Sequence, residues 1–276
     1  MKKHLLTSLF VLGVLLTSCN GGNPTPQQED PKEEEPQIIE GRKASDLAGD
    51  ELKLLPKYIV NRLSSYDSYK AVTKGSTVAN VLFIETIQSI DAEAIKGKDY
   101  SYYRNESHSE IVNTTHVAYF HDNKTAFKNN GESNYQISTL ADYSKTYGVY
   151  PFGECIEGYS ISYFAVLDVK RLDNEEDYKF QISFDPFKAT NDVRVQMKAF
   201  GGLDNYPTFS DIKMTITVKE DFTPTVLSIE STYTAQKLIQ SSCKQSYTVT
   251  YSSYNENIEI ENLDEAKEVL EPANSK

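Results

Sequence analysis

Alternation of apolar and polar residues in the second half of the chain is the feature that most constrains its fold. The stretches Tyr-Lys-Phe-Gln-Ile-Ser-Phe over 178–184 and Ile-Lys-Met-Thr-Ile-Thr-Val-Lys over 212–219 place every second side chain, always an apolar one, on one face. Successive side chains of a strand point to opposite faces, so this period of two predicts strands with one buried and one solvated face. That arrangement is typical of an antiparallel sheet.

The same alternation recurs, more weakly, elsewhere in this half. It predicts three further strands, over 193–199, 225–233 and 245–251. Between the strands lie segments rich in Gly, Pro, Asn and Asp, which predict turns. These segments are 173–177, 185–192, 201–207 and 220–224. They leave too little chain for helical crossovers, so we expect hairpins.

The first half of the chain predicts both strands and helices. Residues rich in β-branched and aromatic side chains predict strands over 77–90, 98–106, 110–120 and 123–127. Apolar residues at helical spacing predict a helix over 52–63, which Pro56 either kinks or divides into two short helices. A second helix is expected over 138–148, capped by Ser138 or Thr139 and ended by Gly148. A short helix over 261–270, with Asn262 as its cap, is expected to close the chain.

These elements predict one α+β domain over residues 42–271, followed by a short tail over 272–276. Ten or more antiparallel strands must curl strongly or close. We therefore expect a large curled antiparallel sheet, a half-barrel, with the N-terminal helix and the mid-chain helix on its concave side. With one apolar face, such a sheet encloses either a packed core or a hollow.

The N-terminal segment 1–18 has the layout of a secretory signal. Lys2 and Lys3 precede an apolar run over 5–16, which is too short to span a bilayer. The following Leu16-Thr17-Ser18-Cys19 resembles the lipobox of bacterial lipoproteins. The resemblance implies cleavage before Cys19 and attachment of a diacylglycerol to its thiol. It implies a chain held by lipid on the outer, extracytoplasmic side of the cell membrane; an uncleaved anchor, or cleavage at another small residue, is the alternative.

Residues 19–41 are acidic and contain four prolines, so we expect a disordered tether behind the lipidated cysteine. The formal net charge of the chain is −12. Such an acidic chain is not expected to bind nucleic acid. In an exported protein, Cys155 and Cys243 either pair as a disulfide or remain two free thiols.

No set of residues predicts catalysis, a metal site or a cofactor. His116 and His121 lie five residues apart, so they would face opposite sides of one strand. The stretch Glu-Gly-Tyr-Ser-Ile-Ser-Tyr over 157–163 has Ser162 where a nucleophile elbow requires glycine. The acidic run over 173–177 lacks the spacing of a calcium loop and is expected to be a solvated hairpin tip.

The order of helix, strand meander, mid-chain helix and long hairpins behind a lipobox resembles the LolA/LppX-type half-barrel. Residues 197–234 look like the strand–turn–strand run of that superfamily, with a lysine-bearing turn at Phe222-Thr223-Pro224 and a strand that ends in tyrosine. The chain is also similar to uncharacterised lipoproteins of low-GC Gram-positive bacteria. The half-barrel resemblance implies that apolar side chains left uncovered by helices line a cavity for a lipid or another apolar ligand.

Two functions follow as hypotheses. In the first, the chain binds a lipid or another apolar small molecule in a cavity of several hundred Å³. Its expected wall comprises Tyr178, Phe180, Ile182, Phe184, Ile212, Met214, Ile216 and Val218, with Leu140 and Tyr143 from the mid-chain helix. In the second, the chain is an envelope structural or protein-interaction lipoprotein with a packed interior and an exposed apolar patch. The sequence names no protein partner.

Overall fold

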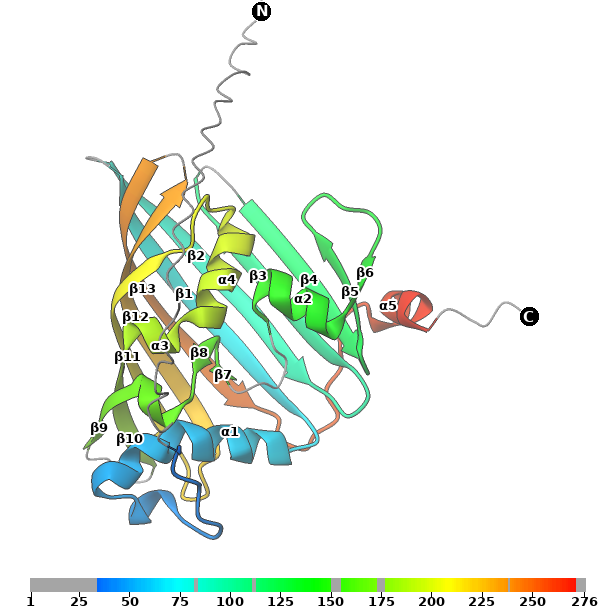
Figure 1. Ribbon diagram of the computed structural model, residues 1–276. Coiled ribbons are helices and arrows are strands. Elements are labelled where there is room, and N and C mark those ends of the chain that lie inside the picture. Colours follow the sequence, from blue (N-terminus) through cyan, green and yellow to red (C-terminus); the bar gives the residue numbers. More distant parts are fainter. Residues whose placement is uncertain are drawn as a thin grey trace, which may run out of the picture. The chain divides into compact units, whose positions relative to one another are not determined.

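A single antiparallel sheet of eleven strands organises the molecule (Figure 1). The computed structural model describes residues 34–81, 84–110, 113–149, 155–172, 177–237 and 239–271. Cys19, the signal segment and the tether up to residue 33 lie outside the described residues. The described residues from Glu35 onward belong to one compact unit. Within the described ranges, no helix is both long enough and apolar enough to cross a membrane.

The strands follow the order β6-β5-β4-β3-β2-β1-β13-β12-β11-β10-β9, so the two halves of the chain meet where β1 pairs with β13. A separate hairpin consists of β7 (Cys155–Ile156) and β8 (Tyr159–Ser160). The strands of the large sheet are β1 (Tyr69–Val81), β2 (Ile84–Lys96), β3 (Ser101–His108), β4 (Asn113–His121), β5 (Lys124–Asn129), β6 (Gln136–Thr139), β9 (Val166–Leu172), β10 (Tyr178–Phe184), β11 (Thr208–Val218), β12 (Pro224–Lys237) and β13 (Ile239–Ser252).

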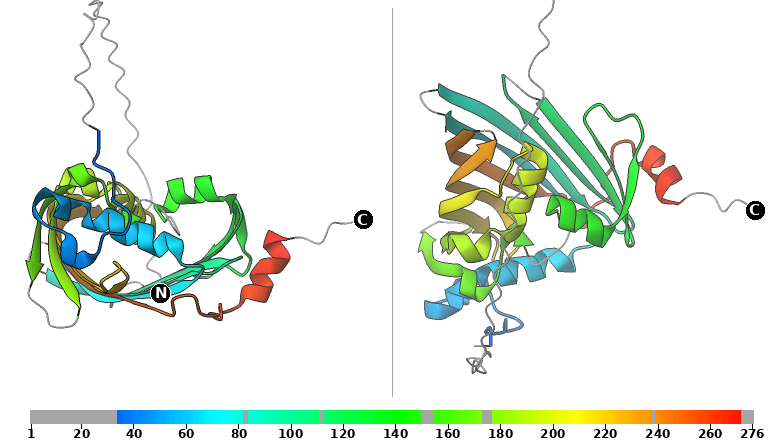
Figure 2. Two further views of the ribbon diagram at one scale, coloured as in Figure 1. Left: turned by 90° about the horizontal axis from the view of Figure 1, so that it is seen from below. Right: turned by 45° about the horizontal axis from the view of Figure 1, so that its top comes forward.

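The sheet curls, and four helices lie on its concave side (Figures 1 and 2). These are α1 (Leu55–Ser65), α2 (Leu140–Tyr147), α3 (Pro186–Ala189) and α4 (Asn191–Gly201). The fifth helix, α5 (Leu263–Leu270), packs outside the curl against β4 and β5. Short 3₁₀ helices span Ala44–Asp46, Gly49–Leu54 and Tyr163–Ala165. The expected α+β half-barrel, with the N-terminal and mid-chain helices inside it, is confirmed.

Two of the three helix ends predicted from the sequence, those at Pro56 and at α2, form as expected, and the cap at Asn262 does not. Pro56 stands in the first turn of α1, behind the 3₁₀ turn Gly49–Leu54, so the chain forms two short helices rather than one kinked helix. Thr139 caps α2 by accepting a hydrogen bond from the Asp142 backbone N–H, and Gly148 ends it in the left-handed conformation. Asn262 precedes α5 but makes no capping bond through its side chain.

Two predicted strands are wrong. The predicted strand 77–90 is the end of β1 and the start of β2, with Val81 opposite Ile84 across a hairpin. The sequence between them, Leu82-Phe83, contains none of the residues that usually mark a tight turn. The predicted strand 193–199 is part of helix α4.

The predicted turn 185–192 is also largely helical. Asp185 accepts hydrogen bonds from the backbone N–H groups of Phe187 and Lys188, and Pro186 occupies the first position of α3. An acidic cap followed by proline is a strong helix start, and this combination outweighs the turn composition of the segment.

The half of the sheet from β9 to β12 packs as a solid core. Phe180 lies opposite Ile216 and Ile182 opposite Met214, and all four side chains are completely buried. Helix α1 adds Leu55 and Ile59 to the same core.

The second half of strand β4 is buried on both of its faces. Tyr119 packs outward with Ala266 and Leu270 of α5. Ala118 and Phe120 face the concave side with Tyr143 of α2. The two faces therefore belong to separate apolar clusters.

Candidate ligand-binding site

Small side chains line the concave face at the centre of the sheet. On β1, Ala71 and Thr73 lie opposite Ala94 and Ala92 of β2, and Thr77 and Ala79 continue the same face of β1. Such side chains cannot reach the helices above them, so the face does not pack as the β9–β12 half does. A hollow therefore forms between the sheet and α4.

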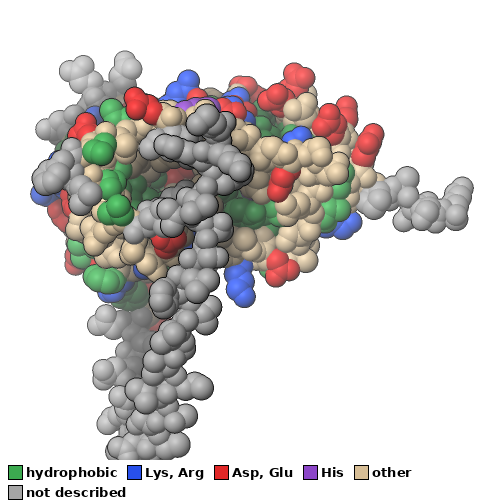
Figure 3. All heavy atoms as spheres, turned by 90° about the horizontal axis from the view of Figure 1, so that it is seen from above, with side chains coloured by type: hydrophobic (Ala, Val, Ile, Leu, Met, Phe, Trp, Pro, Cys, Tyr) green, Lys and Arg blue, Asp and Glu red, His purple; other side chains and the backbone are tan. Residues whose placement is uncertain are grey.

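The hollow contains a cavity of about 240 Å³. Its floor includes Thr77, Ala79 and Ala92, and its roof is the face of α4 that carries Met197 and Phe200. Seen from above, the folded body is hollowed, with hydrophobic side chains in the hollow and both acidic and basic side chains around it (Figure 3). Residues 193–199, predicted as a strand, thus form part of the helix that covers the cavity.

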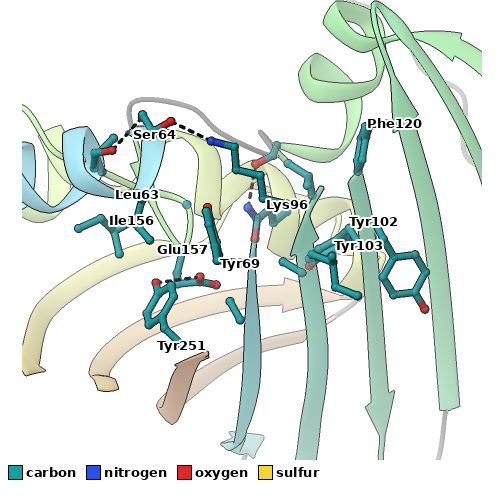
Figure 4. Close-up of a pocket in the computed structure, with 18 residues that line it drawn as sticks. Leu63, Ser64, Tyr69, Lys96, Tyr102, Tyr103, Phe120, Ile156, Glu157 and Tyr251 are labelled. Atoms are coloured by element: carbon teal, nitrogen blue, oxygen red, sulfur yellow. Dashed lines mark hydrogen bonds between the residues drawn. The ribbon is translucent and has the colours of Figure 1, made fainter. Parts of the chain in front are cut away.

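A second cavity of about 100 Å³ adjoins the first, beneath the end of α1. Leu63, Tyr69, Lys96 and Tyr251 are among the side chains around it (Figure 4). Three residues line both cavities, namely Tyr103, Glu157 and Gln196. The two cavities are therefore neighbouring parts of one hollow, and Glu157 lies where they meet.

The β7–β8 hairpin carries Glu157 into this position. Ile156 pairs with Tyr159, and Glu157 and Gly158 form the two-residue turn with φ angles of 49° and 85°. Two successive positive φ angles are the mark of a type I′ turn, which favours Asn, Asp or Gly at its first position. The hairpin is fixed against α4, because the Val193 N–H donates to the Gly158 carbonyl at 3.0 Å.

Tyrosines surround the carboxyl group of Glu157. The Tyr251 hydroxyl donates to Glu157 Oε1 at 3.3 Å (Figure 4). Burial raises the pKa of Tyr69, Tyr103, Tyr247 and Tyr251, and the nearby charge of Glu157 raises each of them further. All four tyrosines are therefore neutral at physiological pH, and none compensates the charge of the carboxylate as a cation would.

Burial raises the pKa of Glu157 to about 7, although its hydrogen bond with Tyr251 acts in the opposite direction. The side chain lies deep in the molecule, yet part of its surface is accessible because it faces the cavities. A carboxyl group in this state exchanges a proton near neutral pH and can pair with a charged ligand group.

Other polar groups of the hollow are held by the fold. Lys96 Nζ donates to the Ser64 carbonyl of α1 at 2.9 Å, and Gln196 Nε2 donates to the Gly148 carbonyl at 2.8 Å. Cys243 lines the larger cavity, and burial raises the pKa of its thiol, which disfavours the reactive thiolate. The side chain of Cys155 lies outside the described residues, so its pairing with Cys243 stays a prediction.

The ten residues expected to form the ligand wall lie elsewhere. Eight of them lie on β10 and β11, and none of these lines either cavity. Tyr178 packs half-buried against the main core. The other seven are buried in that core, namely Phe180, Ile182, Phe184, Ile212, Met214, Ile216 and Val218. Leu140 and Tyr143 belong to a separate cluster between α2 and β4. The structure thus brings the strand residues together as solid core, because their large side chains fill the space that they were expected to enclose.

The histidines serve the fold or the surface. His116 contacts Asn129 through Nδ1 and the Tyr143 hydroxyl through Nε2, at 2.9 and 2.7 Å. Burial lowers the pKa of His116 to about 4, so the ring is neutral. In the part of the chain that the structure describes, no group of three or more His, Cys, Asp or Glu side chains could hold a metal ion.

Comparisons with known proteins identify no family. No family model matches the chain, and no curated protein matches it. Solved structures that are similar to it include three of low identity. The lipoprotein LprF from Mycobacterium bovis is 13% identical, with 78% of this chain and 97% of that chain covered and a TM-score of 0.39. A DUF1329 family protein from Desulfovibrio piger is 9% identical (76% and 95% covered, TM-score 0.28). A LolA superfamily protein from Nitrosomonas europaea is also 9% identical (76% and 94% covered, TM-score 0.28).

Proposed function

We propose that the chain is a lipoprotein that binds a lipid-like or other apolar ligand in the hollow between its sheet and α4. The observation that carries this proposal is the cavity of about 240 Å³ over the small side chains of β1 and β2. A protein that needed only a rigid body would gain stability by filling this space, because buried voids forgo both apolar transfer and dispersion energy.

The size of the cavity bears on the class of ligand. Pockets for drug-sized molecules have volumes of about 300 to 1,000 Å³, so this cavity of about 240 Å³ lies just below that range. Such a volume suits one acyl chain or a small amphiphile better than a complete lipid with several chains. Hydrogen-bonding side chains, among them Asn105 and Gln245, share the lining with apolar groups, which also favours an amphiphile.

Ligand binding is tested by extraction of the purified protein. Residues 20–276, which include the compact unit, are expressed in a bacterial host, extracted with organic solvent and examined by mass spectrometry. We expect a lipid in stoichiometric amount, and we expect its depletion in the variant Ala92→Leu, whose longer side chain enters the cavity. A clean extract from the wild type, with no binding of an apolar fluorescent probe, would refute the proposal.

Membrane anchoring is the second part of the proposal. It is supported by the lipobox-like sequence Leu16-Thr17-Ser18-Cys19 and places the folded body on the outer side of the cell membrane. Metabolic labelling of the full chain with palmitate is the test. We expect labelled protein in the membrane fraction from the wild type and none from Cys19→Ser; an unlabelled wild type, or the same amount of label in both proteins, would contradict acylation at Cys19.

One observation favours the alternative, an interaction function. Ile84, Ile87 and Ile239 are 67%, 58% and 51% exposed. All three lie at the same end of the sheet, where the β1–β2 and β12–β13 hairpins adjoin. Exposed apolar side chains that gather in this way often mark an interaction site. The extraction experiment separates the two functions, because only ligand binding requires a lipid in the cavity.

A further inference from the structure

Glu157 is the one charged side chain that lines the larger cavity among the described residues. The smaller cavity adds Lys96, whose Nζ is held by the Ser64 carbonyl at the end of α1. No Lys or Arg of the described residues forms an ion pair with Glu157. Among the described residues, the uncharged Tyr251 hydroxyl donates a hydrogen bond to its carboxylate.

The placement of this carboxylate is costly in two ways. A buried carboxyl group without a cationic partner loses hydration that is not replaced. In addition, Glu157 adopts the left-handed conformation, which Asn, Asp or Gly would adopt at lower cost in this turn. A glutamate contributes nothing to the turn itself, so these costs point to a role for its side chain in the hollow.

The surroundings of Glu157 suit a cation. Four tyrosines lie close enough for the charge of Glu157 to raise their pKa, namely Tyr69, Tyr103, Tyr247 and Tyr251. The ring centroids of Tyr69 and Tyr251 are 6.4 Å apart. The faces of tyrosine rings attract organic cations, most strongly where water is excluded. A carboxylate among such rings is the combination that holds alkylammonium groups, whereas an anionic group would be repelled.

We infer that the hollow takes an amphiphile with a cationic nitrogen in its head group, which pairs with Glu157 among the four tyrosines while its apolar chain fills the larger cavity below Met197 and Phe200. This inference rests on the proposed ligand-binding function and specifies the class of ligand. The formal net charge of −12 favours the approach of such a ligand to the molecule.

Three amphiphiles with the same dodecyl chain test the inference, namely dodecyltrimethylammonium, dodecyl sulfate and dodecyl maltoside. Each amphiphile is titrated, below its micellar concentration, into residues 20–276 with a bound apolar fluorescent probe at pH 8 and physiological salt. Displacement of the probe measures its affinity. We expect the cationic amphiphile to bind at least about tenfold more tightly than the anionic one. Glu157→Gln should remove most of this preference, whereas the matched control Glu230→Gln, which removes the same charge from an exposed position on β12, should retain it.

The pH dependence gives a second readout. Between pH 6 and pH 8 the wild type should bind dodecyltrimethylammonium progressively more tightly as Glu157 ionises. The groups that face Glu157 do not titrate in this range: the tyrosines of β1, β3 and β13 are neutral, and α4 contributes the amide of Gln196. Lys96, on β2, lies at the α1 end of the smaller cavity.

The outcomes separate the inference from the function on which it rests. Equal preference in the wild type and Glu157→Gln, or tighter binding of the sulfate or the maltoside than of the cation, would overturn the inference and leave the binding function intact. Failure of all three amphiphiles and of the apolar probe to bind the wild type would overturn both.

Discussion

The two halves of the concave face share one backbone pattern and differ in the volume of their side chains. On β10 and β11 the inward positions carry Phe180, Ile182 and Met214, which meet the covering elements and leave no space. On β1 and β2 they carry Ala71, Thr73 and Ala92, which leave the two cavities of the hollow open. The alternation of apolar and polar residues therefore decides which face of the sheet is buried. The volume of the buried side chains decides whether that face forms a packed core or a cavity.

Strand β13 is the boundary between the two halves. Its Tyr247, Val249 and Tyr251 all belong to the buried core, but only the two tyrosines also line the hollow. Gly75 on β1 lies directly opposite Tyr247, and a Cβ atom at Gly75 would come within 2.3 Å of the Tyr247 Cβ. This glycine thus permits the close approach of the two strands at the edge of the cavity.

The same truncation should cost far more stability in the β10–β11 half than in the β1–β2 half. Ile182→Ala removes a completely buried side chain and should lower the free energy of unfolding by about 2 to 5 kcal/mol. Ile90→Ala removes a side chain that already borders the cavity and should cost about 1 kcal/mol. Urea unfolding of both variants measures the difference. Equal losses would mean that the hollow is packed as tightly as the core.

The charge in the hollow should make its stability depend on pH. The pKa of Glu157 rises from 4.5 in the unfolded chain to about 7 in the fold, so between these values the native state binds more protons. Stability therefore falls as the pH rises from about 4.5 to about 7, and the loss is complete above 7. At about 1.4 kcal/mol per pKa unit, it amounts to about 3 kcal/mol at most.

Thermal or urea unfolding of the wild type and Glu157→Gln between pH 4 and pH 8 checks this. The wild type should become less stable relative to the variant as the pH rises. Burial lowers the pKa of His116 to about 4, so this histidine favours the folded state as the pH rises from 4 to 6.5. This contribution is the same in both proteins and cancels when their stabilities are compared. A difference between the two proteins that does not change with pH would contradict the assigned environment of Glu157.

The strands and helices whose residues carry local signals could be predicted from the sequence. Alternation located β10 and β11, and Thr139 and Gly148 marked the ends of α2. Helix α4 was missed because Val193, Val195 and Met197 also alternate as in a strand. Its actual face consists of Val193, Gln196, Met197 and Phe200, at helical spacing, and the polar Gln196 hid that spacing.

The site was harder to predict, because a cavity forms where side chains are too small to fill the space between the sheet and the helices. The largest apolar residues gave the clearest pattern, yet these are the residues that fill space. The informative signal was weaker: small residues at alternate positions of one strand, Ala71, Thr73, Gly75, Thr77 and Ala79. Glu157 gave no signal at all as a binding residue, since its position depends on which hairpin the fold turns inward.

Enlarging an alanine should also have different effects on stability in the closed core and in the hollow. Ala126→Leu, at a completely buried position between β5 and α5, should cost about 1 to 3 kcal/mol, because a closed core cannot accept three more carbon atoms without strain. Ala92→Leu directs the same atoms into the cavity and should change the free energy of unfolding by less than about 1 kcal/mol. It should instead weaken the binding of dodecyl maltoside about tenfold, since the added atoms occupy the space of the apolar chain. A variant that is as destabilised as Ala126→Leu, or that binds the maltoside as well as the wild type, would show that the space above Ala92 is not where the ligand lies.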